Sequence, residues 1–157
     1  MLSLMLSVAL VEPEIPQNTG NIARLCAATR TPLNIVGVTG FRMDDRAVRR
    51  AGLDYWDEVS ITRHRDLEAL LASQPHARML YFSTKGECSL WDYKFEKDDC
   101  LVFGPETRGL PEALLKANWD RCLTIPMLNR NVRSLNLANA VSIALYEALR
   151  QLQTTRS

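Results

Sequence analysis

Residues 123–152 constrain the fold more than any other stretch, because they hold the longest helix-compatible pattern in the chain. A short apolar run at residues 123–125 stops at Pro126, which cannot donate to a sheet ladder, so a strand is predicted to end there. A polar loop follows. We expect a helix to begin at or just beyond Ser134, because a serine hydroxyl can cap the free backbone N–H groups of a first helical turn.

The predicted helix is apolar on more than one side. One stripe of apolar residues recurs at helical spacing, and further apolar residues lie off it. The stripe consists of Ala138, Val141, Leu145, Ala148, Leu149 and Leu152, and the residues off it are Leu137, Ala140, Ile143 and Ala144. By itself the pattern favours an ordinary core helix. It also fits a helix that touches both its own core and a partner subunit.

A chain of 157 residues with 46% hydrophobic content predicts one compact domain, residues 1–157, with a core that needs no metal or disulfide staples. Lys and Arg number 19 and Asp and Glu number 18, which leaves a formal net charge of +1. There is no global basic field, so any contact with nucleic acid must come from a local patch.

The four cysteines match no zinc-ligand or CxxC spacing, and three of them lie in apolar runs. We therefore predict buried thiols in a reducing cytosol and no metal site, with His64 and His76 at the surface.

Residues 1–11 are apolar and predict a buried first strand rather than a signal peptide, because no basic leader precedes them. No apolar run is long enough for a membrane span.

Strands and helices alternate along the chain, which predicts an α/β fold with a largely parallel sheet flanked by helices. Residues 18–21 supply capping chemistry ahead of a first helix, and residues 66–73 predict a helix with Leu67, Leu70 and Leu71 turned inward. Residues 87–99 show no clear period and predict a loop with one helical turn. Further strands are expected at residues 33–38, 58–62, 78–84 and 100–103, and further helices from Asp44 or Asp45 and at residues 110–117.

Three loops leave the carboxyl ends of predicted strands with unusual residues, namely residues 82–86, 104–109 and 126–134. In open α/β sheets ligands bind outside these strand ends, so we expect the loops to converge on one pocket. Glycines in the loops allow close backbone approach, and main-chain N–H and C=O groups suit an adenine or a nucleoside. GxGxxG, GxxxxGK[ST] and GxSxG are absent, which argues against Rossmann dehydrogenases, P-loop NTPases and α/β-hydrolases.

Three longer segments are PEIPQNTGNIARLC near the start, LVFGPETRGLP in the centre, and IPM followed by RSLNLANAVSIALYEALRQ near the end. In this order and spacing they resemble the three motifs of SPOUT-class RNA 2′-O-methyltransferases. The sequence resembles the minimal branch of that class, the TrmL (YibK-like) tRNA wobble-nucleotide methyltransferases. The resemblance covers nearly the whole chain, including RAGLDYWDEV between the motifs, with no appended RNA-binding domain.

The resemblance implies a homodimer and a deep trefoil knot at the C-terminal end, where the last helix is threaded through a loop. It implies that S-adenosyl-L-methionine binds in the knot. Arg24 matches the catalytic arginine of the family. Carried over to matching positions, the main cofactor contacts are Phe82, Gly104, Ile125 and Ser134, and the lining residues are Thr84, Glu106, Met127, Leu135 and Asn136.

The implied reaction is methyl transfer to the ribose 2′-OH of the wobble nucleotide, cytidine 34 or modified uridine 34, of tRNA(Leu)-type substrates in the cytoplasm. A guanidinium has a pKa above about 12 and is a poor base. We therefore hypothesise that Arg24 binds the adjacent phosphate and stabilises the developing alkoxide. Glu106 either orients the hydroxyl or faces the sulfonium as a second catalytic residue, or it caps the helix that starts near Leu110.

Arg46, Arg49 and Arg50 are predicted to bind phosphates of the tRNA anticodon loop, together with Arg130 and Arg133. The first three also fit a solvated helix face. Within the class, the alternative substrate is ribosomal RNA or another tRNA position. From a different class, a non-catalytic RNA-binding dimer module would bind RNA without S-adenosylmethionine. Residues 128–132 align with no family segment, so they predict no base preference.

Overall fold

A computed structural model describes residues 6–154, without the side chains of residues 52–54 and 154. Strands and helices alternate as predicted, with three short 3-10 helices labelled η. The elements are β1 (Ser7–Val11), α1 (Pro16–Thr29), β2 (Leu33–Val36), α2 (Arg46–Gly52), η1 (Leu53–Glu58), β3 (Ile61–His64), α3 (Leu67–Ser73), β4 (Met79–Phe82), β5 (Cys88–Ser89), η2 (Leu90–Asp92), β6 (Cys100–Phe103), α4 (Glu112–Ala117), η3 (Trp119–Arg121), β7 (Cys122–Thr124) and α5 (Leu137–Thr154).

The seven strands form one sheet in the order β3-β2-β1-β6-β4-β7-β5, and every pairing is parallel. This confirms the predicted parallel α/β sheet. β6, β4 and β7 are neighbours in the sheet although they are far apart in the chain, so the loops that follow them leave the same edge side by side. The buried first strand is confirmed at β1, while residues 1–5 of that prediction lie outside the described residues.

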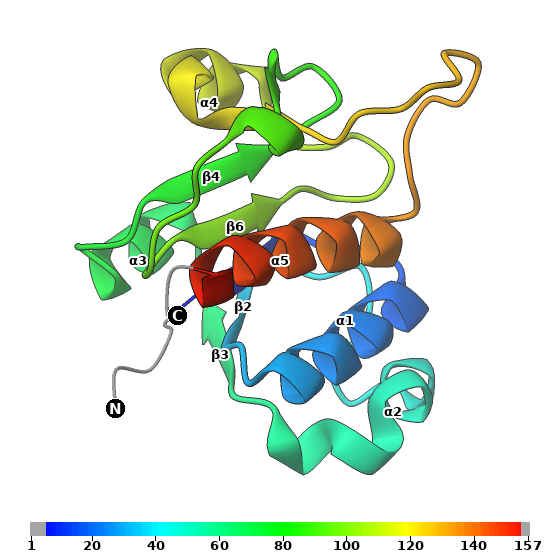
Figure 1. Ribbon diagram of the computed structural model, residues 1–157. Helices are drawn as coiled ribbons and strands as arrows, with labels where there is room; N and C mark the ends of the chain where they lie inside the picture. The colour runs from blue at the N-terminus through cyan, green and yellow to red at the C-terminus, as the bar shows by residue number, and fades with distance from the viewer. Residues whose placement is uncertain (1–5, 155–157) are drawn as a thin grey trace.

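Two apolar layers cover the sheet, one on each face. Alternate strand residues point to opposite faces, so Val8 and Leu10 enter one layer and Ala9 enters the other. The first layer contains the apolar faces of α1 and α5, and the second contains residues of α3 and α4. In Figure 1, α5 runs across the front of the sheet with α1 beside it, and α2 lies beyond α1.

Five local predictions were wrong. The strand predicted at residues 58–62 begins only at Ile61, because η1 extends to Glu58. α1 begins at Pro16, so Asn18, Thr19 and Gly20 are buried inside the helix rather than ahead of it. Residues 88–89, predicted as loop, form β5. Leu71 of α3 is 39% exposed, although Leu70 is buried. α5 begins at Leu137, and Asn136 rather than Ser134 caps it, because the Asn139 N–H donates to Asn136 Oδ1 at 3.2 Å.

The predicted buried thiols are observed. Cys26, Cys100 and Cys122 are buried, and all four cysteines are free. Loss of hydration raises the pKa of Cys26 to about 12 and that of Cys100 to about 11, so both thiols stay protonated at neutral pH.

His76 is exposed as predicted, whereas His64 is half-buried, with Nε2 2.8 Å from Asn34 Oδ1. Between residues 6 and 154, no helix is long and apolar enough to cross a membrane.

Candidate active site

A cavity of about 450 Å³ opens at the carboxyl ends of β6, β4 and β7. The loops that follow these strands form most of its wall, and the loop before α1 and the first turn of α5 complete it. A crevice outside the carboxyl ends of parallel strands is where open α/β folds bind ligands. The three loops that the sequence singled out therefore lie around one cavity.

All nine residues predicted to contact or line a cofactor lie in the wall of this cavity. Phe82 ends β4 and Thr84 follows it, Gly104 and Glu106 follow β6, and Ile125 and Met127 follow β7; Ser134, Leu135 and Asn136 precede α5. Ile15 and Asn18 also line the cavity and were not predicted to do so, whereas Lys85 belongs to the predicted loop at residues 82–86. Asn18 stands in the first motif, but it had been assigned to capping.

Two stacked aromatic rings form part of the cavity wall. The rings of Phe82 and Phe103 are 4.7 Å apart between centroids, with an interplanar angle of 11°. The two residues are paired across β4 and β6, so sheet register fixes the stack. The wall thus combines aromatic and aliphatic surface with hydroxyl and amide groups, as in sites for small organic ligands.

Glu106 binds the chain just before α1 rather than the helix near Leu110. Its Oε1 accepts the Glu14 N–H at 2.8 Å, and its Oε2 accepts the Ile15 N–H at 2.7 Å. These donors lie at the start of α1, where Ile15 offers no capping side chain. The expected capping of the helix after Leu110 is therefore wrong, and the carboxylate caps α1 from a distant loop.

An amide chain extends this link to the third motif. Asn18 Nδ2 donates to Glu106 Oε2 at 3.3 Å, and Asn136 Nδ2 donates to Asn18 Oδ1 at 3.1 Å. One hydrogen-bonded network therefore joins the first motif, the loop after β6 and the cap of α5 along the cavity wall.

A second set of contacts closes the loop after β6 onto the segment after β1. Thr107 donates to Glu14 Oε1 through its N–H at 3.0 Å and its hydroxyl at 2.7 Å. The Thr107 backbone and side-chain hydrogen bonds together hold the pKa of Glu14 below its usual value. Arg108 forms an exposed ion pair with Glu12 at 2.7 Å.

Gly104 is required by the loop itself. A Cβ at this position would lie 2.4 Å from the Leu110 backbone nitrogen and 2.5 Å from the Gly109 carbonyl carbon. Gly109 has a φ of +68°, in the left-handed region that favours glycine. Both glycines therefore allow the loop to fold tightly, and the close approach of a ligand to its backbone stays a prediction.

Arg24 does not line the cavity. It lies on the exposed side of α1, with Cζ 4.9 Å from the centroid of the Tyr55 ring in η1. The structure therefore separates Arg24 from the nine cofactor candidates within one chain.

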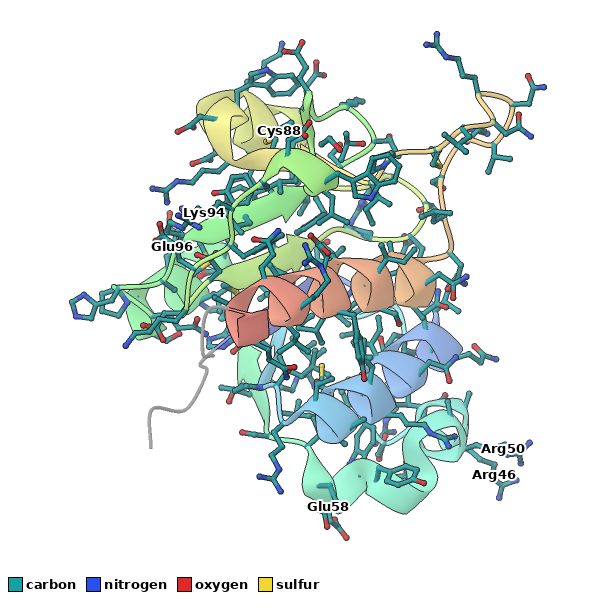
Figure 2. The ribbon with its side chains drawn as sticks, in the orientation of Figure 1. Arg46, Arg50, Glu58, Cys88, Lys94 and Glu96 are labelled. Atoms are coloured by element: carbon teal, nitrogen blue, oxygen red, sulfur yellow. The ribbon has the colours of Figure 1, made fainter. Side chains whose placement is uncertain are left out.

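The arginines of α2 form a basic patch, defined here as Arg46, Arg49 and Arg50. Together with Asp44 they line a surface depression, and Figure 2 shows Arg46 and Arg50 projecting away from the body of the molecule. Asp44 pairs with Arg42, and Asp45 Oδ1 accepts the Ala47 N–H at 2.7 Å. Neighbouring carboxylates are thus bound elsewhere, and the three guanidinium groups have no ion pair within the described residues.

Arg130 and Arg133 lie apart from the basic patch, in the segment between β7 and α5. Figure 1 shows this orange segment extending beyond the body of the molecule. Arg133 lines the cavity, whereas Arg130 is exposed and does not. Leu128 and Val132 of the same segment are 94% and 46% exposed.

Among the described residues, no group of three His, Cys, Asp or Glu side chains could hold a metal ion.

Residues 5–146 match the model of the SpoU rRNA Methylase family. Among curated proteins, the tRNA (cytidine(34)-2′-O)-methyltransferase of Escherichia coli K12 is 48% identical over 149 residues, covering 94% of each chain. The enzyme of the same name from Saccharophagus degradans is 47% identical and covers 94% of this chain and 96% of its own.

Solved structures of similar proteins agree with these sequence relationships. A structure described as giving insight into the 2-OH methylation of C/U34 on tRNA superposes with a TM-score of 0.91 at 48% identity, covering 96% of this chain and 97% of that one. The SpoU methyltransferase AviRb from Streptomyces viridochromogenes, solved with the cofactor AdoMet, has a TM-score of 0.85 at 26% identity. That match covers 97% of this chain and 59% of AviRb.

Proposed function

The chain belongs to the SpoU rRNA methylase family, and from this premise we propose that it is a tRNA methyltransferase that acts on the ribose 2′-OH of nucleotide 34. The methyl donor is S-adenosylmethionine, and the substrate nucleotide is cytidine or modified uridine in a tRNA of the tRNA(Leu) type. The observation that carries this proposal is the cavity built by all three motif loops in a chain 48% identical to an enzyme of that name.

The cavity fits the proposed cofactor in size and chemistry. Its volume of about 450 Å³ is in the range of small-molecule sites. Phe82, Phe103 and Ile125 offer apolar surface for a purine, and Ser134 and Asn136 offer polar groups for a ribose or an amino acid. When bound, S-adenosylmethionine supplies an electrophilic methyl group on a sulfonium ion.

Glu106 contributes to this site as a structural carboxylate. It is the only carboxylate in the cavity wall within the described residues, and both of its oxygens accept N–H donors from the start of α1. It therefore cannot take the hydroxyl proton without giving up hydrogen bonds that shape the wall. We assign it to positioning rather than to proton transfer.

Arg24 is proposed to bind the phosphate next to nucleotide 34 and to stabilise the developing alkoxide. Its position outside the cavity wall of its own chain supports a homodimer in which Arg24 of one copy reaches the cavity of the other. The exposed apolar residues of α5, Ile143 at 43% and Tyr146 at 55%, support a subunit contact on that face. The trefoil knot stays a prediction.

RNA binding is proposed to use the basic patch on α2, with Arg130 and Arg133 near the cavity. Three guanidinium groups within two helical turns, none with an ion pair in the described part of the chain, favour a bound anion, because they otherwise repel one another. The affinity for tRNA should fall with salt: the logarithm of the binding constant should change with the logarithm of the salt concentration with a slope of about −0.7 for each phosphate neutralised on a single strand.

The reaction is assigned to the cytoplasm, which suits four free cysteines.

The decisive experiment offers the protein labelled S-adenosylmethionine with total tRNA and, separately, ribosomal RNA, and then maps the labelled nucleotide. A 2′-O-methyl group at position 34 of a leucine tRNA is expected. Label at another tRNA position or in ribosomal RNA would establish the alternative substrate. Binding of RNA without methylation, together with no calorimetric binding of S-adenosylmethionine, would establish the non-catalytic module.

Arg24→Lys is the variant that tests the role of the guanidinium. Near-normal turnover by this variant would exclude a role of Arg24 that depends on guanidinium geometry.

A further inference from the structure

The ring of Tyr55 holds the guanidinium of Arg24. The Arg24 Cζ lies 4.9 Å from the ring centroid, within cation–π range, and Tyr55 is 41% exposed. No ion pair or side-chain hydrogen bond holds the Arg24 side chain within the described part of the chain, so the ring is its one partner there. An arginine proposed to act on RNA is thus oriented by an aromatic residue from another element.

The backbone that carries Tyr55 is anchored on both sides. η1 follows α2 directly, and α2 packs closely on α1 at Gly20. Val48 of α2 is fully buried, and Trp56, the residue after Tyr55, packs against the core. The exposed ring therefore stands on an anchored backbone segment, against which the Arg24 side chain is held.

The contact with the ring leaves the N–H donors of the guanidinium available. A cation–π contact uses the charge of the guanidinium and none of its five N–H donors as a hydrogen bond, so these donors can bind a phosphate or an alkoxide. Because the side chain is already ordered, less rotamer freedom is lost when the donors engage the RNA.

We propose that Tyr55 is a positioning residue for the methyl-transfer reaction, which orients the Arg24 guanidinium so that its N–H edge meets the phosphate and the 2′-oxygen of the nucleotide. This inference rests on the proposed function, since it requires Arg24 to act on RNA. Tyr55 itself contacts neither the cofactor nor the reacting atoms.

The test compares Tyr55→Leu, Tyr55→Phe, Arg24→Ala and the double variant Arg24→Ala/Tyr55→Leu under saturating cofactor. Tyr55→Leu is expected to lower kcat about 3- to 30-fold, which corresponds to a cation–π contact that is partly desolvated by RNA. Calorimetric affinity for S-adenosylmethionine should not change, because Tyr55 is outside the cavity wall. Tyr55→Phe keeps a ring and should retain kcat within about twofold.

Two controls separate positioning from general damage. Trp119→Leu removes an aromatic ring of similar exposure, 39%, and should behave like the wild type. In the Arg24→Ala background, Tyr55→Leu should have no further effect, because the group that it positions is gone.

The inference is overturned by a normal kcat in Tyr55→Leu, by an equal loss in the Arg24→Ala background, or by a loss of cofactor affinity. A wild-type chain that methylates no RNA refutes the proposed function and this inference with it. Normal wild-type turnover with an unaffected Tyr55→Leu variant refutes the inference alone.

Discussion

At the scale of single residues, Glu106 connects segments that are 92 positions apart. Its carboxylate accepts the backbone N–H groups of Glu14 and Ile15 and the side-chain amide of Asn18. Hydrogen bonds to an ionised group are stronger than neutral ones, and a helix start favours a negative charge. The residue thus fixes the distance between the loop after β6 and the start of α1, and with it one wall of the cavity.

Replacement of Glu106 by Gln should lower the free energy of unfolding by about 1–3 kcal/mol, because the amide N–H₂ would face a backbone N–H and leave it unpaired. Affinity for S-adenosylmethionine should fall as well, since the wall loses its anchor. Urea unfolding and calorimetry measure the two effects. Glu112→Gln is the matched control, because its exposed ion pair with Lys116 at 3.4 Å contributes little. Equal stability of the two variants would contradict this role for Glu106.

Glu14 predicts a small acid dependence of stability. The Thr107 N–H and hydroxyl hold the pKa of the folded carboxyl below the ordinary value of 4.5. A carboxyl with a depressed folded pKa contributes stability at pH above its unfolded pKa and loses it as pH falls through the folded pKa. Between pH 6 and pH 3, wild type should therefore lose its advantage over Glu14→Gln in urea midpoint. A constant difference between the two midpoints across this range would contradict the assignment.

At the scale of elements, the contact between α1 and α2 positions the basic patch. A Cβ at Gly20 of α1 would lie 2.5 Å from Ala51 Cβ and 2.5 Å from the Val48 carbonyl oxygen. The absence of a side chain thus lets α2 lie directly on α1. Arg24 stands one turn after Gly20 on the same face of the helix, and η1 continues from α2 to meet it.

Gly20→Ala should displace α2 and lower the free energy of unfolding. The strain of an added methyl group in a packed contact costs about 1–3 kcal/mol, which exceeds the roughly 1 kcal/mol that alanine gains in a helix interior. Binding of tRNA should weaken and lose part of its salt dependence, while calorimetric affinity for S-adenosylmethionine stays near wild type. Ala28→Ser, on the exposed side of α1, is the control. Tighter tRNA binding by Gly20→Ala would count against the placement of the patch.

The sequence predicted those elements whose signals are local. The runs that became β1, β2, β4 and β6 are buried and largely apolar. Ends of parallel strands that lie side by side bring their loops together. The residues of the cavity wall could therefore be predicted from the order of the segments and from the family resemblance. The start of α1 was missed because its cap, Glu106, comes from a distant loop. β5 was missed because two residues give no period, and its pairing with β7 is set by tertiary structure.

The sequence also did not predict that Arg24 lies outside the cavity wall of its own chain. The resemblance led us to expect Arg24 and Glu106 in one site, but the helix face that carries Arg24 is fixed only when α1 packs on the sheet. In this chain Ile22, Ala23 and Cys26 face the core, which turns Arg24 outward. Resemblance therefore named the residue, and packing decided where it can act.

At the scale of the whole molecule, α5 has one face in the core and one face that remains exposed. Val141, Ala144, Leu145 and Ala148 are fully buried against the sheet. Asn139, Ile143, Tyr146 and Arg150 follow one another at helical spacing on the exposed side. An isoleucine and a tyrosine are open to solvent on a helix beside α1, and they favour a second copy of the chain as the covering partner. The role proposed for Arg24 would likewise require a cavity other than that of its own chain.

Tyr146→Asp should shift the protein from dimer to monomer, because a carboxylate in an apolar contact would lose its hydration without a partner. Sedimentation velocity at several concentrations measures this shift, and Ala113→Asp on the exposed side of α4 is the control for an added charge. The fold should survive, since Tyr146 is 55% exposed and contributes little to the core. Turnover should fall together with the dimer fraction, because Arg24 and the cavity then belong to separate molecules. A stable monomer with full turnover would contradict the shared site, whereas a dimeric Tyr146→Asp variant would move the contact to another face.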